Sequence, residues 1–262
     1  MPPKAKENSG SQARIRQVPA LTRGIAILRH LAQSDEPLGV NQIARDTDLI
    51  PSTCLHILRT LVEEELVVVE EETKRYSLGI GVLPLARTVL MKNVFNHVVQ
   101  THLDNLSNDF GMTSIGVQVT GVKHMVVVAI ARSRLPFRLQ VDVGSRFPGL
   151  ISATGRCHAA FNNLSRRDLK RQFDALSWDN PPTYEDWISQ IEETKKRGYG
   201  IDTGDYIRGV TILSAPVFNK AGAMTNCIVT VGVSEQVKSM GLEPIAEQLL
   251  IAARETTNSI NM

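Results

Sequence analysis

Apolar residues recur at helical spacing in two short segments near the N-terminus. The pattern predicts helices at residues 40–46 and 51–64, joined by a tight turn at 47–50 and preceded by a helix at 21–33. Pro51 suits the first position of the second helix, because its missing N–H would have no partner there. Two short helices joined in this way predict a helix-turn-helix.

Two short apolar strands follow this pair of helices. They cover residues 66–69 and 75–78 and flank a charged tip at 72–75. The helices and the strand pair together predict a winged helix-turn-helix over residues 18–80, and the polar residues 1–17 predict a disordered tail. Such a domain is used above all to place its second helix in the major groove of DNA.

The second helix of the pair has one apolar and one polar face. Its apolar stripe consists of Cys54, Leu55, Leu58, Leu61 and Val62. Its polar face consists of Ser52, Thr53, His56 and Thr60, with Arg59 flanking them. Short polar side chains on one face can read base edges. The candidate contacts to phosphate or the groove edge are Arg23, Arg59, Lys74 and Arg75. Simpler interpretations stay open. The polar face could be the solvated side of an amphipathic helix, and Lys74 and Arg75 could be ordinary charged residues of a turn.

The rest of the chain shows a helical pattern and then a strand-rich one. Residues 81–110 predict linker helices, and residues 111–262 predict a second domain. Its strands are expected at 114–120, 125–131, 138–141, 212–218 and 227–233, and its helices at 166–176, 184–197 and 242–257. The last two strands read as a hairpin. Strands mixed with helices in this order predict an α+β fold.

Composition narrows the class of protein. The 262 residues suffice for two domains, and no apolar run reaches the roughly 18 residues that a membrane span needs. The polar N-terminus lacks the apolar stretch of a signal peptide. Three widely spaced cysteines argue against a disulfide framework and against a metal site of the CxxC type. We therefore expect a cytoplasmic protein with no membrane partner, no metal and no cofactor.

The charge distribution adds little support for a nucleic-acid partner. The net charge is only +2. Residues 1–30 are locally basic, whereas acidic residues gather at 63–65 and 70–72. A DNA-binding surface needs local positive charge, so acidic residues beside the wing count against this interpretation unless they point away from DNA.

Several local motifs, in this order and spacing, resemble those of the IclR family of bacterial transcriptional regulators. They lie at residues 18–28, 51–53, 58–61, 74–79, 147–156, 197–202 and 214–218. The resemblance implies a cytoplasmic, ligand-responsive regulator of a catabolic operon that binds double-stranded operator DNA. It also implies a GAF-like second domain that binds a small-molecule effector, often a carboxylic acid. Homodimers, often paired into homotetramers, would match palindromic operators.

The resemblance implies an effector site in the second domain. Its residues would be Ala153, Thr154, Gly155, Asp202, Ile212, Val229 and Val231. Some relatives carry Cys and two Ser where Ile212, Val229 and Val231 stand, and bind small polar acids. The apolar side chains here predict a larger aromatic or branched monocarboxylate, or its neutral analogue. The N–H groups of Thr154 and Gly155, at a helix start, would hold the carboxylate.

Simpler roles stay open at these positions. Asp202 could be a turn residue, the three apolar residues could be ordinary sheet core, and Gly155 could serve backbone shape alone. In the DNA-reading helix, the family usually carries an arginine where His56 stands. A neutral histidine cannot grip guanine as arginine does, so the base contact at this position differs from the usual one.

The sequence also allows two other classes of function. The pair Cys157-His158 suggests a Cys-dependent hydrolase, but adjacent residues on a helix point about 100° apart and rarely pair. A buried cysteine beside a surface histidine is the simpler interpretation, and we expect no enzyme. The other class is a DNA-binding dimerisation protein with a vestigial pocket, which a ligand-induced shift in melting temperature would exclude.

Overall fold

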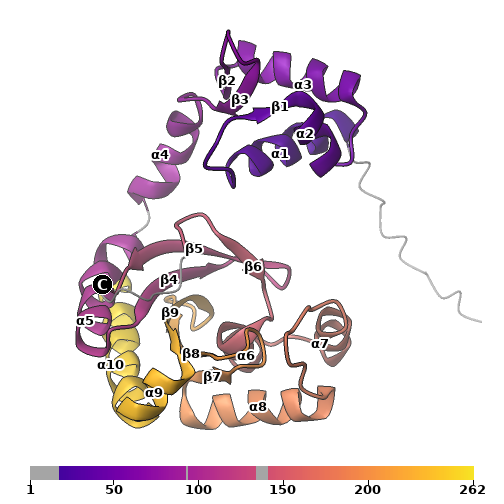
Figure 1. Ribbon diagram of the computed structural model, residues 1–262. Coiled ribbons are helices and arrows are strands. Elements are labelled where there is room, and N and C mark those ends of the chain that lie inside the picture. Colours follow the sequence, from indigo (N-terminus) through magenta and orange to yellow (C-terminus); the bar gives the residue numbers. More distant parts are fainter. Residues whose placement is uncertain (1–17, 93, 134–140) are drawn as a thin grey trace, which may run out of the picture. The chain divides into compact units, whose positions relative to one another are not determined.

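The computed structural model describes residues 18–92, 94–133 and 141–262, so the predicted tail at residues 1–17 lies outside the described residues. The chain divides into two compact units, with the boundary after Lys92. Unit 1 is helical with a small sheet, and unit 2 is built on a larger antiparallel sheet (Figure 1). The predicted α+β class is confirmed. None of the described helices is long and apolar enough to cross a membrane.

Unit 1 is a winged helix-turn-helix, as predicted. Its helices are α1 (Pro19–Leu31), α2 (Val40–Asp46), α3 (Pro51–Glu63) and α4 (Val82–Lys92). Its strands are β1 (Leu38–Gly39), β2 (Val67–Val69) and β3 (Arg75–Leu78). The strands pair antiparallel in the order β1-β3-β2, and β2 and β3 form the wing.

Helix α3 shows how the sequence builds this unit locally. Pro51 stands at its first position, and Ile50 before it is extended, which is the conformation that the residue before a proline prefers. Cys54 and Leu58 are fully buried, one turn apart, in a core shared with α1 and α2. This apolar stripe holds α3 in place and leaves the opposite face of the helix outside the core.

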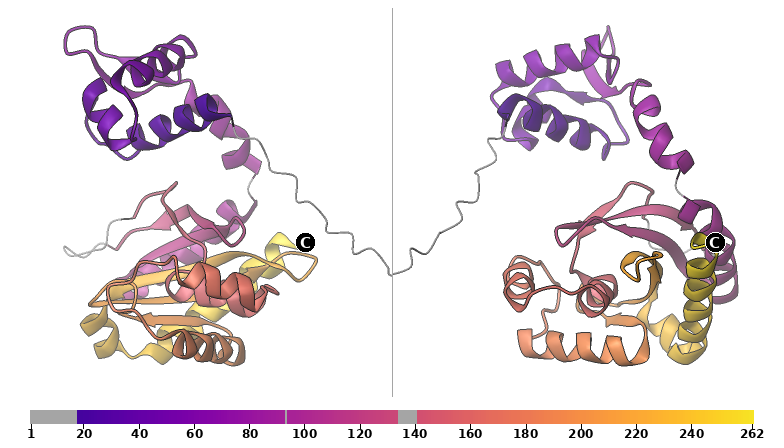
Figure 2. Two further views of the ribbon diagram at one scale, coloured as in Figure 1. Left: turned by 90° about the vertical axis from the view of Figure 1, so that its right-hand side faces the viewer. Right: turned by 180° about the vertical axis from the view of Figure 1, so that it is seen from behind.

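Unit 2 is built around a six-stranded antiparallel sheet in the order β6-β5-β4-β9-β8-β7. The strands are β4 (Thr113–Val119), β5 (His124–Ala131), β6 (Arg146–Pro148), β7 (Gly200–Thr203), β8 (Val210–Phe218) and β9 (Met224–Val233). The helices are α5 (Val94–Phe110), α6 (Ser152–Phe161), α7 (Arg166–Phe173), α8 (Tyr184–Arg197), α9 (Ser234–Met240) and α10 (Leu242–Ile260). Helices α5 and α10 cover one face of the sheet, and α6, backed by α8, covers the other (Figure 1 and Figure 2).

Side chains along the strands of unit 2 alternate between two cores. In β8, Leu213 and Ala215 pack on the side of α5 and α10, whereas Val210 and Ile212 pack on the side of α6. This alternation follows from the two-residue period of a strand. Neighbouring residues of one strand therefore meet different helices, and only one of the two faces lies next to α6.

The segment predicted as linker helices, residues 81–110, is divided between the two units. Helix α4 belongs to unit 1 and α5 to unit 2. In α5, Phe95, Val99 and Leu103 are buried against the sheet. Their four-residue spacing makes a continuous apolar stripe, which is typical of a helix that packs against a core. Helix α5 is therefore part of the body of unit 2 and not only a connector.

A few elements differ from the prediction. The hairpin predicted at 212–218 and 227–233 is present as β8 and β9. Of the strand predicted at 138–141, residues 138–140 lie outside the described residues, and Val141 is not in a strand. Strands β1 and β6 and helix α9 were not predicted. Strand β1, with two residues, is too short to show a periodicity.

Candidate functional site

The outer face of α3 carries the predicted DNA-reading side chains. Ser52, His56 and Arg59 are exposed, and Thr53 is half-buried. Leu58, on the opposite face, is fully buried. The core therefore fixes the orientation of α3 and leaves this polar row outside the core of unit 1.

The predicted phosphate contacts differ in their surroundings. Arg23 on α1 and Lys74 at the tip of the wing are exposed. Within the described residues, neither they nor Arg59 form an ion pair. Arg75 is exposed as well, but one of its Nη atoms donates to the carbonyl oxygen of Pro37 at 3.2 Å. That bond ties the wing to the loop before β1, so part of the Arg75 guanidinium already serves the fold.

The wing also carries the acidic run that the sequence places there. Glu70, Glu71 and Glu72 are all exposed. The Glu70 carboxylate accepts a hydrogen bond from the Thr73 hydroxyl within the same turn. Lys74 follows at φ 53°, in the left-handed region. The tip of the wing therefore carries both positive and negative side chains. The nearby carboxylates weaken the attraction of its positive side chains for DNA phosphates.

In unit 2, the predicted carboxylate-binding loop forms the first turn of α6. Ser152 begins the helix at φ 56°, and a Cβ at Gly155 would lie 1.9 Å from the carbonyl carbon of Leu150. The Gly155 N–H donates to the carbonyl of Ile151 at 2.8 Å, so it is already engaged within the protein. In the first turn of a helix, the N–H groups of the first three residues have no carbonyl partner within the helix. Thr154 is the third residue of α6, so its N–H can donate to a bound carboxylate as predicted, whereas the N–H of Gly155 cannot.

Four of the predicted effector residues lie together on the α6 side of the sheet. Ala153, Ile212, Val229 and Val231 are all buried in one apolar cluster. The other buried members of that cluster are Ile115, Val117, Met125, Val127, Ile151, Cys157, Val210, Met224 and Cys227. Residues from α6, β8 and β9 that are far apart in sequence thus meet in one place.

Asp202 takes part in a buried charge network instead of standing alone. Its Oδ2 accepts from an Nη of Arg156 at 3.0 Å, and both side chains are completely buried. Its Oδ1 accepts from the backbone N–H groups of Gly204, Asp205 and Tyr206. Both oxygens are thus engaged within the protein, and Asp202 fastens the loop after β7 to α6.

Arg156 is the residue that sequence reasoning missed. Its Nε donates to Gln190 of α8 at 2.8 Å, and its second Nη pairs with the carboxylate of Asp205. Burial raises the pKa of Asp205, which the charge of Arg156 opposes. The sequence did contain a signal for this role: Arg156 is the only arginine in a run of mostly small or apolar residues, 150–161. A charged side chain in such a buried run needs partners of opposite charge.

Cys157 and His158 do not pair with each other. The Cys157 thiol donates to the Ser214 carbonyl at 3.0 Å and accepts from the Gly200 N–H at 3.2 Å. The His158 ring is buried, and its Nδ1 lies 3.1 Å from the Gly149 carbonyl oxygen. The prediction of a surface histidine was wrong, because α6 is covered on both sides, by the sheet and by α8. Burial lowers the pKa of His158.

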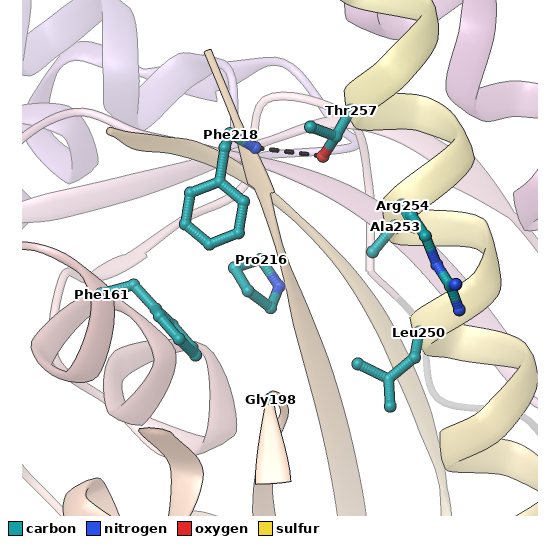
Figure 3. Close-up of a pocket in the computed structure, with 8 residues that line it drawn as sticks. All are labelled: Phe161, Gly198, Pro216, Phe218, Leu250, Ala253, Arg254 and Thr257. Carbon is teal, nitrogen blue, oxygen red and sulfur yellow. Dashed lines mark hydrogen bonds between the residues drawn. The ribbon is translucent and has the colours of Figure 1, made fainter. Parts of the chain in front are cut away.

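A cavity of about 320 Å³ opens at the edge of the sheet in unit 2 (Figure 3). It is lined by Phe161, Gly198, Pro216, Phe218, Leu250, Ala253, Arg254 and Thr257. At this point β7 no longer covers β8, and the Phe218 N–H donates instead to the Thr257 hydroxyl of α10. The predicted effector residues do not line this cavity, so it is a separate feature of the same unit.

Two family models match this chain. Residues 20–71 match the IclR helix-turn-helix domain, and residues 87–258 match the C-terminal domain of the bacterial transcriptional regulator IclR. The second match alone covers more than half of the chain.

Known relatives are similar over nearly the whole chain. The glycerol operon regulatory protein of Streptomyces coelicolor is 23% identical over 250 residues, which cover 94% of this chain and 96% of the relative. The transcriptional repressor AllR of Escherichia coli K12 is 22% identical over 251 residues, which cover 93% of this chain and 90% of the relative.

Solved structures share the fold. An IclR-type transcriptional regulator from Alicyclobacillus acidocaldarius has a TM-score of 0.80 at 22% identity and covers 94% of this chain and 100% of its own. An IclR homolog from Microbacterium hydrocarbonoxydans, solved in complex with 4-hydroxybenzoate, has a TM-score of 0.74 at 14% identity, with coverage of 92% and 98%. The two family matches span both units, and the chain belongs to the IclR family of DNA-binding bacterial transcriptional regulators.

Proposed function

We propose that this protein is a ligand-responsive regulator in which the outer face of α3 reads operator DNA and unit 2 binds a small apolar carboxylate. The observation that carries the proposal is the division of α3 into a buried apolar stripe and a polar row that lies outside the core. Ser52, Thr53 and His56 would face the bases. Arg23, Arg59, Lys74 and Arg75 would contact phosphate or the groove edge.

The DNA-reading role is tested with the double variant Thr53→Ala/His56→Ala. Fluorescence anisotropy measures the affinity for the intergenic DNA beside the protein's own gene and for a random duplex. Both affinities are measured at the same salt concentration, because salt governs non-specific binding. We expect the preference for the intergenic DNA to fall by about tenfold or more, since a good base contact is worth about 1–3 kcal/mol. Unchanged operator preference would refute the assignment. The matched control is Thr101→Ala/Asn105→Ala, two exposed polar residues of α5 in unit 2.

A dimer is part of this proposal. Unit 1 leaves apolar side chains exposed on two helices, with Leu21 on α1 at 63% and Leu85 on α4 at 68% exposure. Large exposed apolar residues on helices favour self-association, and two copies would present two α3 helices to the two half-sites of a palindrome. Sedimentation velocity of Leu21→Glu and Leu85→Glu variants tests this. Both variants retaining the wild-type sedimentation coefficient would exclude these faces as the dimer contact.

For the effector, we propose an aromatic or branched monocarboxylate between α6 and strands β8 and β9. The apolar side chains of Ile212, Val229 and Val231 support this choice, because none can orient a polar ligand by a hydroxyl group. The first-turn N–H groups of α6, including that of Thr154, would donate hydrogen bonds to the carboxylate. The fold likeness to a protein solved with 4-hydroxybenzoate is consistent with such a ligand.

The effector class is tested by thermal shift with benzoate-like acids against glyoxylate and pyruvate. We expect the benzoate-like acids to raise the melting temperature more, since binding to the folded state stabilises it. A Val229→Ser variant should narrow that difference. Tighter binding of glyoxylate or pyruvate would refute the proposed class, and no shift with any acid would favour a dimerisation protein with a vestigial pocket. By linkage, an acid that weakens operator binding must itself bind less tightly to the DNA-bound protein.

A further inference from the structure

Two cysteine side chains from distant parts of the chain meet in unit 2. Cys157 on α6 and Cys227 on β9 are completely buried members of the same cluster. The Cys157 sulfur lies 3.0 Å from the Ser214 carbonyl oxygen of β8. Cys227 stands on the neighbouring strand β9, opposite Pro216 of β8, and neither cysteine is in a disulfide. Cys54, the third cysteine of the chain, lies in the core of unit 1. The odd number of cysteines thus resolves into one pair and one isolated thiol.

The surroundings of the two thiols are unequal. Burial raises the pKa of Cys157. Hydrogen bonds with Cys227, Ser214 and the Gly200 N–H, together with the charge of Arg197, outweigh burial and leave that pKa below its ordinary value. Burial and the neighbouring Cys157 raise the pKa of Cys227 well above its ordinary value. An acidic thiol beside a protonated one is the arrangement in which the first attacks an oxidant and the second resolves the product.

The cavity at the sheet edge lies beside this pair. Phe161 lies one helical turn after Cys157 on α6, and Pro216 of β8 stands directly opposite Cys227 in the strand register. Gly198 lies two residues before Gly200, whose N–H donates to the Cys157 sulfur. All three of these neighbours line the cavity (Figure 3). The wall of the cavity thus includes near neighbours of both thiols, which are themselves buried behind it.

We propose that Cys157 and Cys227 form a disulfide when a small hydroperoxide enters through this cavity. The Cys157 thiolate attacks the outer oxygen of the peroxide, the O–O bond breaks, and the leaving oxygen takes a proton to become water or an alcohol. The resulting sulfenic acid is attacked by the sulfur of Cys227, which gives up its proton. The S–S bond forms and water leaves. Both thiols are oxidised, and one peroxide is reduced.

The disulfide would join α6 to β9, the elements on either side of the predicted effector residues. It would also replace the hydrogen bond from Cys157 to the Ser214 carbonyl, because the sulfur would no longer carry a proton. The modification requires only the geometry of unit 2. It therefore does not depend on the DNA-binding or effector proposals.

The test is mass spectrometry of the full chain after treatment with excess hydrogen peroxide, without reducing agent. We expect a loss of two hydrogens that dithiothreitol reverses. Trypsin should release one cross-linked species that joins residues 157–166 to residues 221–238. Cys157→Ser and Cys227→Ser should each abolish the loss of two hydrogens, whereas Cys54→Ala should retain it. Thermal melting of each variant establishes that it is folded.

An Ala253→Phe variant, which fills the cavity, should slow the oxidation by about tenfold, because oxidation of a thiol depends on access to it. Three outcomes would each overturn the proposal. They are the addition of oxygen atoms to single cysteines without a disulfide, an intermolecular disulfide through Cys54, and no change in the mass of the folded protein. If the protein binds one equivalent of a soft monovalent cation such as Ag⁺ and forms no disulfide with peroxide, the proposal is wrong and the pair is a metal site instead.

Discussion

The two units place their candidate functional residues in opposite environments. In unit 1, Ser52 and His56 stand exposed on a helix whose other face is buried. In unit 2, Arg156 and Asp202 are completely buried and bound to each other. The first arrangement leaves polar groups ready for an external partner, whereas the second uses them within the protein. Exposed polar residues on a fixed helix therefore favour recognition, and buried ones must first satisfy one another.

This difference has a consequence for mutation. Exposed side chains can be removed with little effect on folding, so a loss of function at those positions reports on contact with the partner. Buried network residues couple folding to function, and a variant there disturbs both. Variants of buried and of exposed residues therefore test this contrast between the two units. Trp178 and Trp187 both lie in unit 2, so tryptophan fluorescence follows that unit alone.

The largest effect is expected at the buried network. Arg156→Met removes the partner of a completely buried Asp202 and should destabilise unit 2 by about 3–5 kcal/mol, since an unpaired buried charge is costly. Urea unfolding followed by tryptophan fluorescence measures this. Arg156→Lys keeps the charge but not the fork that reaches Gln190, Asp202 and Asp205, and should recover only part of the loss. A change below 1 kcal/mol in Arg156→Met would contradict the role assigned to the network.

The next effect is expected at the start of α6. Gly155→Ala would place a Cβ 1.9 Å from the backbone of Leu150, and backbone cannot move aside cheaply. We expect a loss of about 1–3 kcal/mol, as in other overpacked cores. The matched control in unit 1 is Gly39→Ala, where nothing lies within 4 Å of the new Cβ and φ is −76°. Circular dichroism melts should separate the two variants, and equal melting temperatures would show that α6 can shift.

A smaller effect is expected from pH through His158. Burial lowers its pKa in the folded state, so the unfolded chain binds a proton more readily. Stability of unit 2 should therefore fall as the pH drops below about 6.5, the ordinary value for histidine, and level off below the folded-state pKa. The difference in urea midpoint between about pH 7.5 and about pH 5.5 should shrink in His158→Gln. An unchanged difference in that variant would remove His158 as the cause.

The smallest effect on stability is expected on the outer face of α3. Thr53→Ala/His56→Ala should change the stability of unit 1 by no more than about 0.5 kcal/mol, because neither residue belongs to the core. Leu58→Ala on the buried face of the same helix should cost about 2–5 kcal/mol. Circular dichroism melts provide the comparison. A double variant as unstable as Leu58→Ala would mean that any loss of DNA binding reflects unfolding.

Much of unit 1 could be predicted from the chain alone. The stripe that contains Cys54 and Leu58, with Pro51 before it, predicted α3 and its outward face, because these signals lie within a few turns of one helix. Strands β2 and β3 were found in the same way. The hairpin of β8 and β9 was also predictable, since its two strands are neighbours in sequence.

The sequence by itself thus determined the local elements, the division into a winged helix and an α+β domain, and which side chains of α3 face outward. Only the tertiary structure decided that α5 belongs to the core of unit 2, that Asp202 is held by Arg156 forty-six residues earlier, and that Cys157 meets Cys227. The physical reason is range. Periodicity and turn preferences act between residues close in sequence, whereas partners of buried charges and thiols depend on which strands and helices pack side by side.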